Sequence, residues 1–378
     1  MKHDTAVSPD AVIVGAGVIG MLTALHLHEA GLRVTLLEQG SGPGREASWA
    51  GGGIVSPLFP WRYPDSVNQL AAYGQRHYPA LAAALAQATG IDPEYQPCGL
   101  LMLDTPEQPL NEAAEAWARR WHVVSQSMVD ADLTRIQPGI QPTGRALWWP
   151  EIGQIRNPRL VKSLAARLQQ LKIPVHSDTA VRDIRVRAGR LQALATSRGT
   201  LSAGQVLVTA GAWSGQLLAG LGRPLPVEPV RGQMILLRGQ PGRVRTMVLA
   251  GAHYLVPRRD GRILVGSTLE RVGFDKTPTA EAAELLLGKA VALMPELGEL
   301  AIEHHWAGLR PGSPVGVPYI GPVPEVEGLF VCAGHFRNGI VMAPGSAALI
   351  AALLLQRTPP LDPAPYALNR SAVEESIV

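Results

Sequence analysis

A glycine-rich turn between an apolar run and a helical pattern constrains the fold of this chain more than any other feature. Residues 11–14, AVIV, are typical of a buried parallel strand because they are apolar and mostly β-branched. The residues after them, GAGVIG, have glycines in the G-x-G-x-x-G spacing at Gly15, Gly17 and Gly20. Residues 21–32 then predict a helix, and RVTLLE predicts a second strand that ends at Glu38.

Each part of this unit has a physical role in binding a dinucleotide. Gly15 permits the sharp turn, Gly17 lets a pyrophosphate approach the backbone, and Gly20 lets the helix pack closely on the strand. The helix N-terminus offers unpaired N–H groups to the phosphates, and Glu38 can accept hydrogen bonds from ribose hydroxyls. A purely structural glycine turn is the alternative, and the motif alone does not separate NAD from FAD.

The segment after Glu38, QGSGPGREASWAGGGIVSP, is rich in glycine and has no strand pattern. A segment so free of side-chain bulk suits a backbone that lies against a large flat ligand, which favours FAD. A flexible loop is the alternative for the same residues.

The rest of the chain predicts further strands and helices without repeats. Helices are expected at 66–89, 111–121, from about 158, at 279–297 and at 346–356, and strands at 98–105, 206–208, 253–257 and 262–266. Residues 303–323 are expected to run through Pro-Gly turns. At 378 residues the chain exceeds the usual size of one core, and no Pro- or Ser-rich linker divides it. We therefore expect a second domain that is inserted into the first.

Composition and charge exclude several classes of protein. Hydrophobic residues make up 46% and charged residues 17% of the chain, which argues against disorder. Lys and Arg exceed Asp and Glu by 34 − 31 = 3 without a cationic cluster, so we expect no nucleic-acid partner. Cys98 and Cys332 lack metal-ligand spacing, which predicts no metal site and a reducing compartment. No signal-peptide pattern is present and the run AALIAALLL is too short to span a bilayer, so we expect a cytoplasmic protein without a membrane partner.

The stretch VCAGHFRNGI, residues 331–340, contains an unexpected charge. Its apolar, glycine-bearing sequence is typical of a buried strand and a tight turn, yet it holds Arg337. No acidic residue follows Arg337 within ten positions. Because a guanidinium matches a carboxylate bidentately, Arg337 is placed to meet the anion of a ligand. An ion pair with a distant carboxylate of the protein is the alternative.

Several motifs together carry a resemblance to a known family. The glycine fingerprint, AGAW at 210–213, HYLVP and GRILVG at 253–266, HWAGLRPGSPVGVPYIGP at 305–322 and GHFRNGI at 334–340 occur in order along nearly the whole chain. In these motifs the chain resembles the D-amino acid oxidase superfamily of FAD-dependent amine oxidases, most of all the glycine oxidases of the thiamine pathway.

The resemblance implies an α/β fold built from two discontinuous domains. The Rossmann-like FAD-binding domain would comprise residues 1–87, 148–225 and 305–378. The inserted α+β substrate-binding domain, with a mixed or antiparallel sheet, would comprise residues 88–147 and 226–304.

The activity implied by the resemblance is oxidative deamination of glycine, and also of sarcosine and small D-amino acids, by hydride transfer from Cα to flavin N5. Oxygen would be reduced to hydrogen peroxide, and the imine would give glyoxylate and ammonia or pass to a thiazole synthase. A D-amino acid dehydrogenase with another electron acceptor stays open, as does a flavin subunit of a larger assembly. The oligomeric state also stays open, a homo-oligomer included.

Site residues follow from the same resemblance. In the first half of the chain it places FAD, held non-covalently, against Gly15, Gly17, Val18, Ile19, Gly20, Glu38, Gln39, Glu46, Ala47, Gly51, Gly52, Gly53 and Val181. Near the C-terminus it adds His335, Phe336, Arg337, Asn338, Gly339, Ile340 and Val341. Arg310 and Arg337 would bind the substrate carboxylate, with the Tyr254 hydroxyl reaching in, and these three are the implied catalytic residues. Sarcosine oxidases attach their flavin in the WAGLRPGSP region, where this chain has no cysteine.

Each of these roles has a plainer alternative. Arg310 also suits a solvated turn, and Tyr254 suits a half-buried position on a strand. His253, His304 and His335 suggest a general base, but hydride transfer from a neutral amine needs none, so we expect them to have packing or structural roles. The Trp148–Trp149 pair is expected in the core.

Two positions depart from the glycine oxidase pattern. Ala252 stands where that pattern has a histidine, and Leu269 stands where it has a methionine. Both positions would lie near the substrate. The resemblance therefore does not fix the preference among glycine, sarcosine and small D-amino acids.

Overall fold

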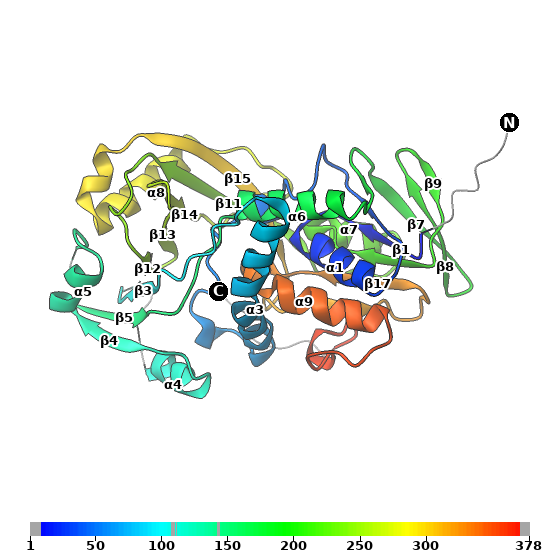
Figure 1. The fold of residues 1–378 in the computed structure, drawn as a ribbon, viewed down its shortest axis with the longest axis horizontal. Helices are drawn as coiled ribbons and strands as arrows, with labels where there is room; N and C mark the ends of the chain where they lie inside the picture. Colours follow the sequence, from blue (N-terminus) through cyan, green and yellow to red (C-terminus); the bar gives the residue numbers. More distant parts are fainter. Residues whose placement is uncertain (1–8, 107–109, 111, 142–143, 371–378) are drawn as a thin grey trace.

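A computed structural model describes residues 9–106, 110, 112–141 and 144–370 of the chain. Two large sheets lie in opposite halves of the molecule, as Figure 1 shows. The expectation about a signal peptide rests largely on residues 1–8, which lie outside the described residues.

A six-stranded sheet, in the order β16-β17-β10-β1-β2-β6, forms the first half. Its strands are β1 (Ala11–Val14), β2 (Val34–Leu37), β6 (Val175–His176), β10 (Gln205–Val208), β16 (Tyr319–Pro322) and β17 (Leu329–Ala333). All neighbours pair in parallel except β16 and β17, which are antiparallel. The four residues of β1 are all buried, as expected for a strand that is covered on both faces.

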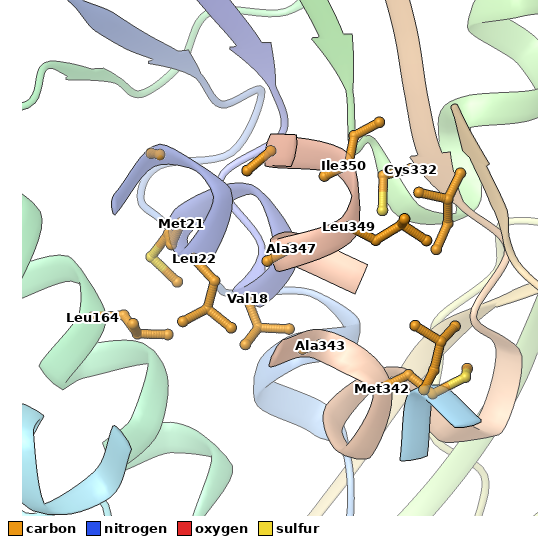
Figure 2. Close-up of a cluster of buried hydrophobic side chains, with 14 of the residues drawn as sticks. Val18, Met21, Leu22, Leu164, Cys332, Met342, Ala343, Ala347, Leu349 and Ile350 are labelled. Carbon is orange, nitrogen blue, oxygen red and sulfur yellow. The ribbon is translucent and has the colours of Figure 1, made fainter. Parts of the chain in front are cut away.

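Helices cover one face of this sheet. Helices α1 (Val18–Glu29) and α9 (Gly339–Leu354) pack on it, and α3 (Asp65–Thr89) and α6 (Asn157–Gln170) pack against these two helices. Figure 2 shows Val18 and Leu22 of α1 gathered with Ala343 and Ala347 of α9 and with Leu164 of α6. The small α9 side chains leave room for the larger ones of α1, and each large apolar side chain buried here contributes roughly 1.5–3 kcal/mol.

The opposite face of the six-stranded sheet is covered by a small antiparallel sheet and a short helix. These elements are β7 (Val181–Arg187), β8 (Arg190–Thr196), β9 (Gly199–Leu201) and α7 (Ser214–Ala219). The predicted strand 206–208 is β10, and it is followed by the short 3-10 helix η2 (Gly211–Trp213) within the AGAW motif.

An eight-stranded sheet forms the second half, in the order β15-β11-β14-β13-β12-β3-β5-β4. Its strands are β3 (Leu100–Leu103), β4 (Gln126–Val129), β5 (Arg145–Trp149), β11 (Glu228–Leu237), β12 (Met247–Ala250), β13 (His253–Pro257), β14 (Ile263–Gly266) and β15 (Ile302–Gly312). Only β3 and β12 pair in parallel among these described strands, so the sheet is mixed. The predicted strands 253–257 and 262–266 are present as β13 and β14, which pair as a hairpin.

Helices and aromatic residues fill both faces of the eight-stranded sheet. Helices α5 (Asp130–Ile136) and α8 (Ala280–Leu293) contribute to one cluster, and α4 (Glu112–Arg120) contributes to the other. Trp149 is fully buried in the second cluster, and its indole N–H donates to Ser125 Oγ at 2.9 Å. Trp148 is partly buried and packs against the first cluster. The Trp pair therefore belongs to the core, as the sequence predicts.

Strand β15 differs from the sequence expectation of Pro-Gly turns. It continues through Pro311 to Gly312 and pairs with β11 over nearly its whole length. Because β15 is an edge strand, the missing N–H of Pro311 need not break the ladder. Arg310 therefore lies on a strand. The glycine-rich segment after Glu38, which has no strand pattern, contains a short helix, α2 (Ala47–Ala50).

The chain crosses between the two large sheets after β2, after β5, after β10 and after β15. The predicted domain boundaries at 148 and 305 fall inside β5 and β15, which both belong to the eight-stranded sheet. We therefore propose the division into a FAD-binding and a substrate-binding domain with these two boundaries moved to the ends of the strands.

Helix α9 is longer than the apolar run AALIAALLL suggests. With the short 3-10 helix η4 (Phe336–Asn338) it forms a continuous helical stretch from Phe336 to Leu354, which by length and composition could cross a membrane. Most of its apolar window, 67%, is buried inside the protein, against α1 and α3. The stretch thus serves as a core helix of the fold.

Candidate active site

A cavity of about 440 Å³ lies between the two large sheets. Its walls come from the turn before α1, from α2 and the glycines that follow it, and from β11, β13 and β15. All the residues predicted to meet FAD or substrate line this cavity, except Gly20 and Asn338. Segments that are distant in sequence therefore converge on one site.

The glycine turn before α1 is too crowded for side chains. Gly15 has φ +104°, and a Cβ on it would lie 2.5 Å from the Thr209 carbonyl oxygen. A Cβ on Gly20 would lie 2.2 Å from the Gly15 carbonyl oxygen, which explains why Gly20 packs behind the turn and does not line the cavity. The backbone of the turn is thus open to the cavity on one side and packed against the residues that follow β10, Thr209 and Ala210, on the other.

Sequence reasoning missed Ser48, which fixes the N-terminus of α1. The Val18 N–H donates to Ser48 Oγ at 2.9 Å, and both residues line the cavity. A hydroxyl beside a helix N-terminus adds a rotatable donor to the free N–H groups there. No sequence signal points to Ser48, because the contact joins two segments that are 30 residues apart.

Glu38 lies at the end of β2 and its carboxylate holds the turn in place. One oxygen accepts a hydrogen bond from the Ala16 N–H at 3.0 Å, and the other accepts from the Gly40 N–H at 2.8 Å. Each carboxylate oxygen has a further lone pair, so Glu38 can also accept hydrogen bonds from a ligand's hydroxyl groups. Val181, at the start of β7, lines the same end of the cavity.

The Gly51–Gly53 segment lies along the middle of the cavity with no room for side chains. Gly53 has φ +78°, and a Cβ on it would lie 1.9 Å from the Ile155 carbonyl oxygen. A Cβ on Gly52 would lie 2.9 Å from a ring carbon of Tyr254. These contacts exclude a flexible loop at this point and leave bare backbone facing the cavity.

Tyr254 comes from β13 and lines the end of the cavity where Arg310 also lies. It is 6% exposed, so the alternative of a half-buried surface position does not hold. Its ring packs against Gly52 and Gly266, and it lines the cavity. Among the described residues the Tyr254 hydroxyl has no hydrogen-bond partner, which leaves it available to a ligand.

Arg310 lies on β15 with its guanidinium across Gly232 of β11. One nitrogen donates to the carbonyl oxygens of Thr268 and Arg231 at 3.1 and 3.3 Å, and the other terminal nitrogen donates to Ser267 Oγ at 2.8 Å. Of the five N–H groups on a guanidinium, two therefore stay free for a ligand. Burial, and then the charge of Arg337, lower the pKa of Arg310 to about 10, so it remains a cation at neutral pH.

Arg337 lies in η4 and lines the same end of the cavity. It is half-buried, and within the described part of the chain no carboxylate lies at ion-pair distance from it. The alternative of a distant ion pair therefore finds no support. Two guanidinium groups without acidic partners, beside a free tyrosine hydroxyl, form a site that suits a small carboxylate.

The three candidate histidines have different surroundings. His335 is 2% exposed and its Nε2 lies 3.0 Å from Ser346 Oγ in the core, and burial lowers its pKa to about 3, so the ring is neutral. His304 is exposed beside Glu303. His253 lies on β13 and does not line the cavity. None of the three is placed as a general base at the substrate end.

Ala252 and Leu269 do not lie where the resemblance implies. Both are exposed, Leu269 to 48%, and neither lines the cavity. The cavity wall near Tyr254 is instead completed by Met234 of β11, which is buried. These two departures from the glycine oxidase pattern therefore lie outside the lining of the cavity.

Two contacts missed by sequence reasoning tie the cavity wall to the segment between β14 and α8. The Lys276 ammonium lies 2.8 and 2.9 Å from the two carboxylate oxygens of Glu46. Phe274 packs against Trp213 with ring centroids 5.4 Å apart. Glu46 and Trp213 line the cavity, so this segment links the two halves of the molecule beside the site.

The residues of the cavity fit FAD better than a metal ion. A helix N-terminus and bare glycine backbone suit the pyrophosphate, Glu38 suits a ribose, and the Gly51–Gly53 backbone leaves room for a flat ring. No group of three His, Cys, Asp or Glu side chains that could hold a metal occurs in the part of the chain that the structure describes.

Comparisons with known proteins agree with this chemistry. The family model described as FAD dependent oxidoreductase, DAO, matches residues 10–353. A glycine oxidase of Pseudomonas aeruginosa is 51% identical over 362 residues, which cover 95% of this chain and 98% of that protein. The bifunctional protein ThiO/ThiG of Synechocystis sp. is 35% identical over 93% of this chain and 52% of its own length.

A solved structure shares the whole fold. The crystal structure of glycine oxidase from Geobacillus kaustophilus superposes with a TM-score of 0.91 at 31% identity, over 97% of this chain and 99% of that one. The predicted fold class, a Rossmann-like α/β domain with an inserted substrate domain, is thereby confirmed.

Proposed function

Since this chain belongs to the DAO family of FAD-dependent oxidoreductases, we propose that it is an oxidase of glycine and similar small amines. One observation carries the proposal. Arg310 and Arg337 line the end of the cavity without acidic partners among the described residues, beside the free hydroxyl of Tyr254. The names of the relatives, glycine oxidase in the nearly full-length matches, support the same substrate.

Arg310 and Arg337 would bind the substrate carboxylate. Arg310 has two N–H groups left after its bonds to Ser267, Thr268 and Arg231, and each charge-assisted hydrogen bond contributes roughly 1.5–3 kcal/mol. The Tyr254 hydroxyl would donate a third bond. Because these groups come from three different elements, they fix the carboxylate in position as well as direction.

Orientation is the main contribution of the protein to the reaction. The Gly51–Gly53 backbone would hold FAD, which would supply the acceptor for the hydride from the substrate Cα, with O₂ as the final acceptor that yields hydrogen peroxide. The two arginines hold the carboxylate at one end, so Cα is turned toward the glycine backbone of the cavity. Tyr254 and Met234, both buried, exclude water from this end.

The residues of the site supply no general base, and the chemistry requires none. The substrate amine reacts in its neutral form, so its proton is lost to solvent before the hydride leaves Cα. His335 is neutral and bonded to Ser346, which supports a packing role. The imine product then hydrolyses to glyoxylate and ammonia.

We propose that FAD is held without a covalent bond. Cys98 does not line the cavity, and Cys332 is buried, which raises the pKa of its thiol and keeps it protonated. Both cysteines are free, which supports a reducing compartment such as the cytoplasm. Acid precipitation of the yellow protein should therefore release all flavin into the supernatant.

The imine is also a candidate for transfer to a second enzyme. The Synechocystis relative is the bifunctional protein ThiO/ThiG, and the matched part covers 52% of its length. This supports a place for the present chain in forming the thiamine thiazole, with a thiazole synthase consuming the imine.

A panel of substrates read by peroxide release tests the proposed activity. We expect oxygen-dependent peroxide with glycine and sarcosine, and smaller rates with small D-amino acids. Turnover with an artificial electron acceptor but without peroxide would indicate a dehydrogenase. No turnover by the flavin-loaded chain with either acceptor would indicate a subunit that depends on a partner.

A further inference from the structure

Arg258 is a buried cation that the proposed mechanism does not use. It follows β13 in the hairpin and is 5% exposed. Burial, and then the charge of Arg156, lower its pKa to about 10, so it stays protonated at neutral pH. The nearest acids, Glu94 and Asp260, pair with Arg156 at 3.2 and 2.8 Å, and within the described ranges no carboxylate pairs with Arg258.

A buried charge without a counterion lowers the free energy of unfolding, so Arg258 must be compensated by its hydrogen bonds. All its acceptors are neutral. One terminal nitrogen donates to the Gly52 carbonyl oxygen at 2.9 Å. The other donates to the Ile155 carbonyl oxygen at 3.3 Å and to Gln154 Oε1. Arg258 therefore joins the hairpin of the eight-stranded sheet to the glycine segment that lines the cavity.

The glycine segment has free donors, and one of them, the Gly53 N–H, belongs to the same peptide group as the Gly52 carbonyl. Gly53 is held by its carbonyl oxygen, which accepts from the Ile155 N–H at 2.8 Å. The N–H groups of Gly52 and Gly53 donate to no acceptor in the described parts of the chain, and both residues line the cavity. A cation on a carbonyl oxygen polarises that peptide and makes its N–H a stronger donor.

We propose that Arg258 is a positioning residue for the flavin: it fixes the Gly52 carbonyl and strengthens the adjoining Gly53 N–H as a donor to an electron-rich edge of the isoalloxazine ring. The inference rests on the proposed function only in placing the flavin ring along Gly51–Gly53. Because the reduced ring carries more electron density than the oxidised ring, the effect is larger on the reduced form.

The test replaces Arg258 by Met, which keeps the stem and removes the charge, and by Lys, which keeps the charge and loses the fork. The matched control is Arg259→Met in the same hairpin, where the guanidinium is exposed and pairs with Asp92 at 2.6 Å. FAD affinity is measured by quenching of flavin fluorescence on titration of the apoprotein. The midpoint potential of the bound flavin is measured against a reference dye.

We expect Arg258→Met to weaken FAD binding 10- to 100-fold. We also expect a tenfold greater loss for reduced than for oxidised flavin, which corresponds to a midpoint potential lower by about 30 mV for a two-electron couple. Arg258→Lys should weaken binding by less and keep the potential near that of the wild type. Arg259→Met should change neither quantity.

Unchanged affinity and potential in Arg258→Met would overturn the proposal, and so would an equal loss of affinity in Arg259→Met. Weaker binding with an unchanged potential would overturn the polarisation and reduce Arg258 to a packing residue. If Arg258→Met does not fold, Arg258→Lys is the deciding variant. Failure of both variants to fold would overturn the proposal and show that Arg258 has only a structural role. Wild-type protein that binds FAD but does not oxidise glycine would refute the proposed function and leave this test intact.

Discussion

Arg231 and Arg310 lie on paired strands of one sheet, yet their charges are compensated in different ways. Arg231 of β11 is 6% exposed and donates to the Glu270 carboxylate and, at 2.6 Å, to Asp275. Arg310 of β15 faces the cavity and donates to neutral oxygens, one of them the carbonyl of Arg231 at 3.3 Å. Two carboxylates balance the charge of Arg231, whereas no carboxylate among the described residues pairs with Arg310.

The difference separates a structural charge from a functional one. A buried ion pair offsets much of its own desolvation cost, so Arg231 needs nothing from outside the protein. Arg310 bears its desolvation cost without an acid, and a bound carboxylate would offset it. The same sheet thus uses Arg231 to hold the segment after β14, and we propose that Arg310 holds the substrate.

The largest effect is expected from Arg310→Met. Loss of two charge-assisted bonds, each worth roughly 1.5–3 kcal/mol, should lower kcat/KM for glycine at least about 100-fold. Steady-state peroxide release measures this, and the flavin absorbance of the purified variant serves as the control for cofactor binding. Arg337→Ala should raise KM for glycine in the same direction with flavin still bound. An unchanged KM in both variants would contradict the carboxylate site.

Arg231→Met should reduce the stability of the protein and lower kcat/KM less than Arg310→Met does. It leaves Glu270 and Asp275 without their cation, so the free energy of unfolding should fall by about 2–3 kcal/mol, less than for a fully buried pair because Asp275 is half exposed. Urea unfolding measures this. Arg271→Met, which removes an exposed pair with Glu228, is the control and should cost less than about 1 kcal/mol. A larger loss of kcat/KM in Arg231→Met than in Arg310→Met would reverse the comparison.

Acid should lower the free energy of unfolding through the ion pair of Arg231 and Glu270. Burial acts to raise the pKa of Glu270, but hydrogen bonds from Thr268, Arg231 and Gln233 outweigh it, so the pKa is lowered from 4.5. A carboxyl group with a lowered folded-state pKa stabilises the protein above its unfolded value and loses this contribution as the pH falls. The free energy of unfolding should therefore decline below about pH 4.5. Glu270→Gln should be less stable at pH 7 and flatter below pH 4.5, and a wild-type slope in the variant would contradict this role.

The smallest effect is expected at the exposed pair beside the cavity. Lys276→Met removes the contact with Glu46. The Lys276 side chain is 43% exposed and the Glu46 side chain is 36% exposed. We expect FAD to bind about two- to fourfold more weakly at low salt and almost unchanged at high salt, because exposed pairs contribute about 0.2–1 kcal/mol and are screened. Lys289→Met on α8 is the control. A salt-independent loss would point to packing of this segment.

Local sequence signals predicted the first βαβ unit, because the apolar strand, the glycine turn and the helix are each specified by neighbouring residues. They did not predict that β15 continues through Pro311, because its pairing with β11 depends on residues far away in sequence. The resemblance named the residues of the cavity, and the family and fold are confirmed. It expected Ala252 and Leu269 near the substrate, and in the structure neither residue lines the cavity. Arg258 and Lys276 carried no local signal at all.

The repeated crossing of the chain between the two sheets has a practical consequence for anyone who cuts the protein. A protease that cuts one of these connections leaves the two halves joined by the connections that remain. The fragments should therefore migrate together until a denaturant separates them. Neither half is encoded by one continuous stretch of the gene. To express the half with the eight-stranded sheet alone, its segments would have to be joined by new linkers.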